Sequence, residues 1–254
     1  SVEFLYPIAE NNHDCLKNFI WGIQSGLERI SKSTEREVIY AAEDIPIFQV
    51  FKYPEFAAFK LFYWMRSVLN IPELDGKKYN SKLVDPALLQ QGKVIHEIYS
   101  KIPSIEIWSD KTISSVLKQI DYYHEAGLFE KKSDAIDLCN IVAKALQDIC
   151  QQANACTKAS VAGYESNFAM YNSDIELGNN CILVNVSGIK TVYLRHHTFN
   201  FMTTTNVAFC NETEQWLKGL IQKSMLISGV SEKQRYQYFR KANDKIEELK
   251  KKIA

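Results

Sequence analysis

The sequence predicts an α+β protein, in which a mostly helical body is followed by a small antiparallel sheet of about three strands and two C-terminal helices. Changes in the hydrophobic pattern carry this prediction. Apolar residues recur mainly at helical spacing in the first part of the chain, alternate with polar ones from Asn167 to Phe209, and return to helical spacing from Asn211 to Ile227. We expect the helical body over residues 1–160 and the strand-and-helix cassette over residues 161–254, as two units or one compact domain.

The first half of the body is predicted from capping residues and prolines. A helix is expected to begin within residues 11–14, because polar capping residues precede an apolar stripe from Leu16 to Ile30. Residues 37–42 are expected to form a short strand or an extended link. Pro54 suits the first position of the next helix, where its missing N–H leaves no bond unmade. That helix is apolar on nearly every side, which is typical of a buried central helix.

Three further helices complete the predicted body. The first begins at Asp85-Pro86 and runs to about Lys101, before Pro103 interrupts the chain. The second is capped by Asp110 or Thr112 and ends near Gly127. The third begins at Ser133.

The strand region predicts a hairpin with a definite register. Ser187-Gly188 lies between two β-rich runs and suits a two-residue turn. This turn pairs the flanking residues as follows: Val186 with Ile189, Asn185 with Lys190, Val184 with Thr191, Leu183 with Val192, and Ile182 with Tyr193. A third strand is expected around Asn200, which lies between two phenylalanines.

Two helices are predicted to close the chain. The first begins near Asn211 and ends before Gly229, and the second begins at a capping box formed by Ser231 and Gln234. Apolar residues in the last helix recur at steps of three and four: Phe239, Ala242, Ile246, Leu249 and Ile253. We predict a dimer interface through Phe239, Ile246, Leu249 and Ile253. The alternative is that this stripe docks onto its own domain.

Composition excludes several classes of protein. The net charge is +0, so the chain has no overall positive field to bind a nucleic-acid backbone. The most apolar stretch, Phe56 to Leu69, is shorter than a membrane span and carries two basic residues. The six cysteines show no close paired spacing, which favours reduced thiols and a cytoplasmic protein that does not bind membranes. Because the chain starts at Ser1, we expect it to be a piece of a longer protein.

No catalytic or metal-binding motif is found, so we assign no catalytic residue, cofactor or metal. The one histidine pair, His196-His197, would point to opposite faces of a strand and is unsuited to sharing a metal. Amphipathic aromatic residues are frequent in the helical body. The candidates for lining a small-molecule pocket are Tyr63, Trp64, Tyr99 and Tyr122, although such residues more often belong to the core.

Residues 112–129 are loosely similar to the recognition helix of winged-helix DNA-binding proteins. Asp121 and Glu125 are unfavourable on a surface that faces phosphates, and Lys111 and Lys118 give little support. An ordinary amphipathic helix that ends at a glycine is the alternative, and we favour it.

Long stretches of the chain resemble a known family. These are AAEDIPIFQVFKYPEFAAFKLFYWMRSVLN (residues 41–70), IWSDKTISSVLKQIDYYHEAGLF (residues 107–129) and the segment over residues 177–239. They are similar to the C-terminal part of a family of bacterial helix-turn-helix (XRE-like) transcriptional regulators. The resemblance implies an N-terminal DNA-binding domain before Ser1, so no DNA-reading residue is carried over to this chain.

The leading hypothesis is therefore an effector-sensing or dimerisation domain of a cytoplasmic transcriptional regulator. Its expected partners are a second copy of the chain, DNA through the missing domain, and a small-molecule effector. A ligand that binds one dimer geometry more tightly than another would shift operator affinity, and the shift is limited by the difference in its affinity for the two geometries. The alternatives are a small-molecule enzyme with an unrecognised site and a ligand-free protein-interaction module. A packed helical body without a cavity would favour the latter.

Overall fold

The computed structural model describes residues 2–4, 12–32, 39–42, 47–155, 168–175, 181–186, 188–196, 200–229 and 232–254. Its helices are α1 (Asn12–Ser31), α2 (Ile47–Val50), α3 (Pro54–Tyr63), α4 (Pro86–Tyr99), α5 (Asp110–Glu125), α6 (Ser133–Ala155), α7 (Val207–Lys223) and α8 (Glu232–Ile253). Short helical turns are η1 (Trp64–Val68), η2 (Pro72–Leu74) and η3 (Ser81–Leu83). The strands are β1 (Val2–Phe4), β2 (Ile39–Ala42), β3 (Ser104–Ser109), β4 (Phe168–Ser173), β5 (Cys181–Val186), β6 (Ile189–His196), β7 (Asn200–Thr204) and β8 (Met225–Leu226).

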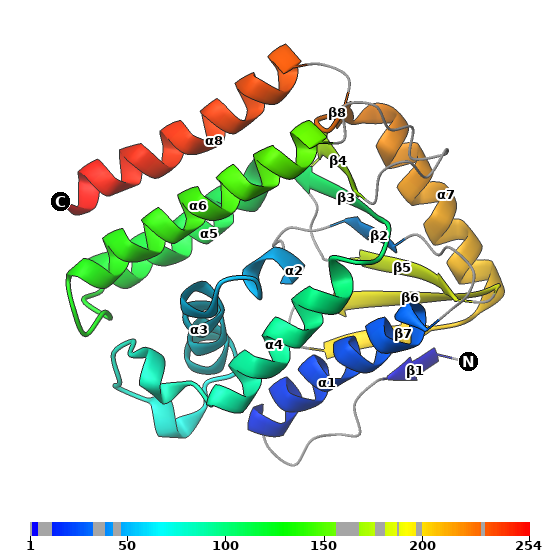
Figure 1. Ribbon diagram of the computed structural model, residues 1–254. Helices are drawn as coiled ribbons and strands as arrows, with labels where there is room; N and C mark the ends of the chain where they lie inside the picture. Colours follow the sequence, from blue (N-terminus) through cyan, green and yellow to red (C-terminus); the bar gives the residue numbers. More distant parts are fainter. Residues whose placement is uncertain are drawn as a thin grey trace.

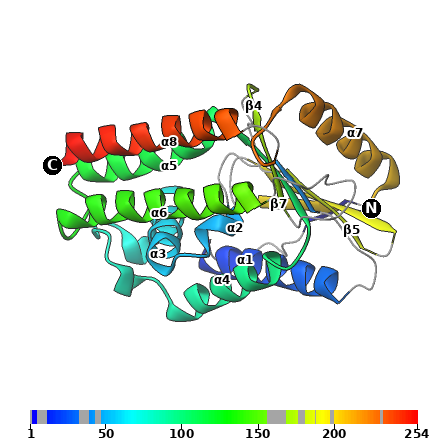
Figure 2. The same cartoon turned by 45° about the horizontal axis from the view of Figure 1, so that its top comes forward.

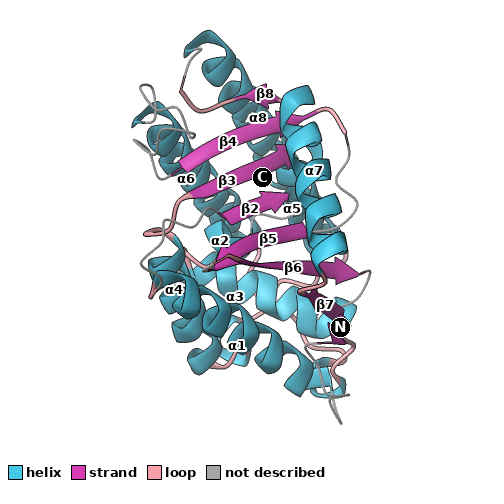
Figure 3. Ribbon diagram, turned by 90° about the vertical axis from the view of Figure 1, so that its right-hand side faces the viewer, coloured by secondary structure: helices cyan, strands magenta, loops and turns pink. Residues whose placement is uncertain are grey.

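The prediction of a small antiparallel sheet of about three strands is wrong. Within the described residues, eight strands form one mixed sheet in the order β1-β7-β6-β5-β2-β3-β4-β8 (Figure 3). β2, β3 and β4 are parallel to one another, whereas the other neighbouring strands are antiparallel. β2 and β3 thus lie between β5 and β4, so residues 1–160 and residues 161–254 contribute to one sheet.

The error has a physical reason. β3 is buried along its whole length, and β2 has only four residues. A strand that is covered on both faces has no need to alternate apolar with polar residues, so the period-two signal is weak. Parallel pairing with β2 and β4 also depends on residues that are far apart in the sequence, which no local pattern reports.

The predicted hairpin is confirmed. β5 and β6 pair in the expected register, from Val186 opposite Ile189 to Ile182 opposite Tyr193. Gly188 has a φ of 79°, a left-handed conformation that glycine adopts without strain. The third strand is also found, as β7, which pairs with β6.

Helix starts follow the predicted capping residues in the body. α3 begins at Pro54, α4 follows an Asp85 cap, and α6 begins at Ser133. α5 is capped by Ser109, in a reciprocal box with Thr112, and not by Asp110 or Thr112 as predicted. α7 begins earlier than expected, after an Asn206 cap. The capping box predicted at Ser231 lies outside the described residues.

Helices cover both faces of the sheet (Figures 1 and 2). α7 packs on β4, β5 and β6 from one side, and α1, α5 and α6 reach the sheet from the other. Side chains of β3 divide between these layers because successive residues of a strand point to opposite faces. Ile105 and Ile107 belong to the smaller core beneath α7, whereas Trp108 belongs to the larger core of the helical body.

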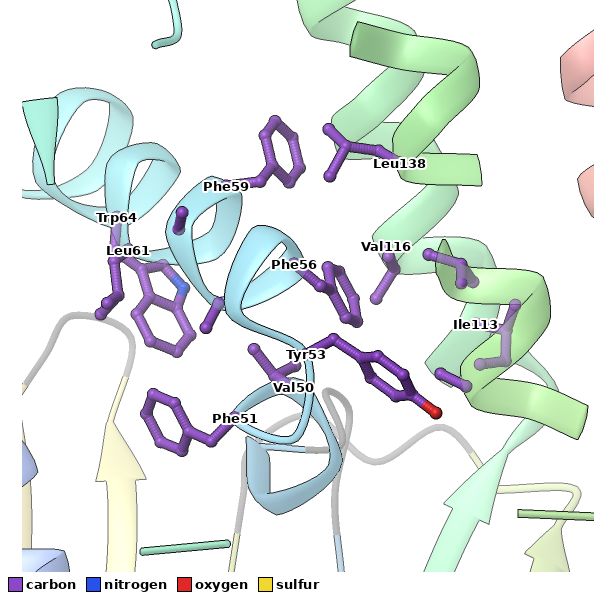
Figure 4. Close-up of a cluster of buried hydrophobic side chains, with 14 of the residues drawn as sticks. Val50, Phe51, Tyr53, Phe56, Phe59, Leu61, Trp64, Ile113, Val116 and Leu138 are labelled. Carbon is purple, nitrogen blue, oxygen red and sulfur yellow. The ribbon is translucent and has the colours of Figure 1, made fainter. Parts of the chain in front are cut away.

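The predicted central helix is buried as expected. α3 carries buried side chains at every position from Phe56 to Phe62. Figure 4 shows the preceding turn and α3 presenting Tyr53, Phe56 and Phe59 towards Val116 of α5 and Leu138 of α6. This cluster fixes the positions of α2 and of the turn that follows it.

The last helix docks onto its own domain, packing on α5 and α6. Phe239, Ile246 and Leu249 are buried there, and Ile253 packs against the same core. A dimer interface through these four side chains would require α8 to leave the domain. Among the described helices, none combines the length and the apolar run that crossing a bilayer requires.

Candidate functional site

A polar pocket opens at the N-terminal end of β3. Its volume is about 190 Å³, below the roughly 300 Å³ at which drug-sized pockets begin, so it suits a small ligand. Its walls come from α2, α4, α6 and the start of β3, and nearly all of them are polar. They comprise Gln49, Lys52, His96, Tyr99, Ser100, Ile102, Ser104, Asp148 and Gln152.

Helical spacing places these side chains together. His96 and Tyr99 lie three residues apart on α4, and Asp148 and Gln152 lie four apart on α6, so each pair shares one face of its helix. Gly92 allows α4 to approach closely, because a Cβ there would lie 2.5 Å from a ring carbon of Phe51. The pocket therefore depends on tight packing between α4 and the turn after α2.

Glu106 lies directly behind the pocket wall. It projects from β3 into the helical body and has no exposed surface. One carboxylate oxygen, Oε1, accepts hydrogen bonds from the Tyr99 hydroxyl at 2.8 Å and from Gln49 Nε2 at 3.2 Å. The other oxygen, Oε2, accepts one from Trp108 Nε1 at 2.9 Å. Two of these donors, Tyr99 and Gln49, also line the pocket, so the carboxyl group orients part of its wall.

Two features of the environment of Glu106 change the pKa of its carboxyl group in opposite directions. Burial raises the pKa of the carboxyl group above its usual range, because the charged form is removed from water. The hydrogen bonds from Tyr99, Gln49 and Trp108 lower the pKa and partly offset that effect. All three donors are neutral, so this carboxyl group is held by hydrogen bonds and not by an ion pair.

Asp148 occupies the opposite wall and is held differently. Lys52 Nζ donates to its Oδ2 at 2.5 Å, and the Tyr53 hydroxyl donates to the same oxygen. The hydrogen bond from Lys52, followed by that from Tyr53, lowers the pKa of this carboxyl group. Asp148 is therefore a carboxylate at neutral pH, and it is about one third exposed beside the pocket.

The four aromatic candidates are not brought together. Tyr99 lines the pocket, but Trp64 is buried in the main core and Tyr122 is 54% exposed on α5. Tyr63 and Trp64 instead flank the buried Lys60, whose Nζ lies 5.2 Å and 5.4 Å from the two ring centroids. Only Tyr99 belongs to the candidate site.

The segment compared with a recognition helix is an internal helix. α5 buries Ile113, Val116 and Ile120 in the core and packs against α6 and α8. Its acidic residues Asp121 and Glu125 both bind Lys252 of α8. The apolar face of α5 is buried, and Lys252 pairs with two acids of its outer face, which is unlike a face that reads DNA.

The described part of the chain contains no candidate metal-binding site, and its fully buried cysteines are not candidates for reactive thiols. No group of three potential metal ligands occurs there, and His197 lies outside it. Cys139, Cys181 and Cys210 are buried and free of disulfides. Burial raises the pKa of the Cys139 thiol to about 11 and that of Cys181 to about 12, so both are unreactive packing residues.

Sequence reasoning missed Gln49, Glu106 and Asp148. A signal existed for Glu106 alone: in the Ser-Ile-Glu-Ile run after Pro103, this acid stands between two isoleucines. In a strand that is covered on both faces, such an acid is buried and requires hydrogen-bond donors. Nothing local marks Gln49 or Asp148, since tertiary packing brings them to one pocket.

Comparison with known proteins adds no identification, because no family model, curated protein or solved structure matches this chain. The resemblance to helix-turn-helix regulators accordingly stays a prediction from the sequence.

Proposed function

We propose that this chain is an effector-sensing domain of a transcriptional regulator, and that the polar pocket between α2, α4, α6 and β3 binds the effector. The observation that carries the proposal is the link between the pocket and the sheet. Tyr99 and Gln49 line the pocket and donate to Glu106, which lies on β3 among the central strands. A ligand that moves either side chain changes the bonding of a buried carboxyl group.

This arrangement suits sensing because a buried polar network has few alternative states. A buried donor that loses its acceptor costs about 1–3 kcal/mol, so a ligand that disturbs the network shifts the conformational equilibrium by a similar amount. That range is comparable with typical coupling energies between sites. The presence of the pocket also favours sensing over a ligand-free interaction module.

The proposal is tested by thermal unfolding of the chain with a panel of small polar compounds, comprising amines, carboxylic acids, amino acids and polyols. A bound compound raises the unfolding midpoint, because binding to the folded state alone stabilises it. Gln152→Trp places a large ring at an exposed position on the pocket wall and should abolish the increase. Gln147→Trp, at another exposed position on α6, is the matched control and should preserve it.

Two outcomes would contradict the proposal. One is that no compound at millimolar concentration raises the midpoint. The other is that the two tryptophan variants respond equally, which would place binding elsewhere on the molecule.

We also propose that the regulator is a homodimer and that it binds DNA through a domain other than the one described. Since the α8 stripe is occupied within the domain, we propose that dimerisation uses another surface. Light scattering over a concentration series measures this directly, and a monomeric mass at micromolar concentration would remove dimerisation from the proposal.

A further inference from the structure

We infer that the pocket recognises a small cationic ligand that donates hydrogen bonds, such as a primary amine or a guanidine. This inference rests on the proposed function and specifies the chemical class of the effector. It follows from which atoms of the wall can donate and which can accept.

Glu106 fixes the polarity of one wall. The Tyr99 hydroxyl donates its single proton to Glu106 Oε1, so its oxygen can otherwise act only as an acceptor. Gln49 must turn its amide nitrogen towards Glu106, which directs its carbonyl oxygen away from the carboxyl group. The remaining capacity of both side-chain oxygens is therefore to accept hydrogen bonds.

Asp148 gives the opposite wall the same polarity. Lys52 and Tyr53 both donate to Oδ2, and among the described residues no donor reaches Oδ1. The carboxylate borders the pocket and is ionised at neutral pH. A ligand ammonium or guanidinium group placed beside Oδ1 would make a charge-assisted hydrogen bond.

The donors of the wall are largely engaged. Lys52, the one lysine or arginine that lines the pocket in the described chain, already binds Asp148 at 2.5 Å. The Ser100 hydroxyl donates to the carbonyl oxygen of Glu97 at 3.0 Å. An anionic ligand would have to compete with Asp148 for Lys52 while facing the oxygens of Tyr99 and Gln49. A cationic donor would meet an acceptor at Asp148, beside the ammonium group of Lys52.

The test uses three compounds with the same four-carbon chain and different end groups. Putrescine carries ammonium groups, 1,4-butanediol carries hydroxyls, and succinate carries carboxylates. Calorimetric titration of the chain should show putrescine binding at least tenfold more tightly than 1,4-butanediol, with no heat from succinate. Agmatine, which carries an amine and a guanidine, should bind as well as putrescine or better.

Three variants test which side chains bind putrescine. Asp148→Asn keeps the shape of the side chain and removes its charge, and should weaken putrescine binding at least tenfold. Gln49→Met keeps the length and removes the accepting oxygen, and should weaken binding several-fold. Asp110→Asn alters a carboxyl group outside this pocket and should change the dissociation constant by less than twofold.

The outcomes separate this inference from the function on which it rests. Preferential binding of succinate would overturn the cationic ligand, while leaving a pocket that senses an anion through Lys52. Equal binding of putrescine to the Asp148→Asn, Gln49→Met and unaltered chains would also overturn it. The sensing function itself is contradicted if Gln152→Trp weakens the binding of none of these probes and of no compound in the wider panel.

Discussion

β3 has an acidic residue near each end, and the two are held in opposite ways. Glu106 is completely buried and held by three neutral donors, beside a pocket of about 190 Å³. Asp110, just beyond the C-terminal end, is partly exposed and binds Lys241 of α8 at 2.6 Å and Asn172 at 3.0 Å. The cavity beside Asp110 has a volume of only about 20 Å³, enough for one water molecule.

This difference is the reason why we place the proposed ligand site at the amino end of the strand. Ligands usually bind at the carboxyl ends of parallel strands, but here α8 closes that end and its lysines neutralise the acid. At the amino end the carboxyl group organises neutral side chains around an open space. The pKa of Glu106 is raised mainly by burial, and that of Asp110 is lowered mainly by the hydrogen bond from Lys241.

The two ends of β3 should differ most in the free energy of unfolding that is lost when each acid is replaced. Glu106→Leu leaves three buried donors without an acceptor, and each costs about 1–3 kcal/mol, so we expect a loss of roughly 3–5 kcal/mol in the free energy of unfolding. Asp110→Ala breaks an exposed ion pair and removes the acceptor of only one buried donor, the Asn172 amide, so it should cost about 1–2 kcal/mol. Urea unfolding measures both, and equal losses would contradict the comparison.

The close approach that shapes the pocket should be the next most sensitive feature. Gly92→Ala drives a methyl group against the buried ring of Phe51 and should destabilise the chain by about 1–3 kcal/mol. Gly219→Ala is the matched control, because a Cβ at this position of α7 meets nothing within 4 Å. It should stabilise the chain by about 0.5–1 kcal/mol through helix propensity. A stabilising Gly92→Ala would show that α4 does not pack as described.

The pH dependence of stability should differ in sign between the two acids. Because the pKa of Glu106 is raised on folding, its contribution is present below the unfolded pKa, near 4.3, and is lost as pH rises through the folded value. The penalty of Glu106→Gln relative to the unaltered chain should therefore shrink as pH rises through that window. The pKa of Asp110 is lowered, so its contribution is present at neutral pH and lost as pH falls through the folded value. Denaturant unfolding at a series of pH values distinguishes these trends, and a Glu106→Gln penalty that grows with pH would contradict the first.

The smallest expected effect concerns the helix that closes the carboxyl end. Lys241→Met removes the ion pair with Asp110, and its cost should be under about 1 kcal/mol and should diminish in high salt, because exposed pairs are screened. Unfolding at low and high salt measures this effect. A large effect that is insensitive to salt would mean that α8 depends on this pair more than on its apolar stripe.

Local patterns predicted the parts of the fold that depend on neighbours in sequence. The register from Val186 to Tyr193 follows from one turn, and the start of α3 follows from Pro54. The sheet was missed because β3 pairs with β2 and β4 across long stretches of chain. The site was missed for the same reason: Glu106, Gln49 and Asp148 meet only when α2, α6 and β3 are packed.

The measurement that tests the central claim most directly is an NMR titration of the indole N–H signals with putrescine. Trp108 donates its indole N–H to Glu106, whereas Trp216 is half exposed on α7 and serves as an internal control. If the pocket at the amino end of β3 is the binding site, the Trp108 signal should shift in proportion to occupancy while that of Trp216 stays fixed. A shift of Trp216 without Trp108, or saturable binding that leaves the Trp108 signal unchanged, would contradict the account.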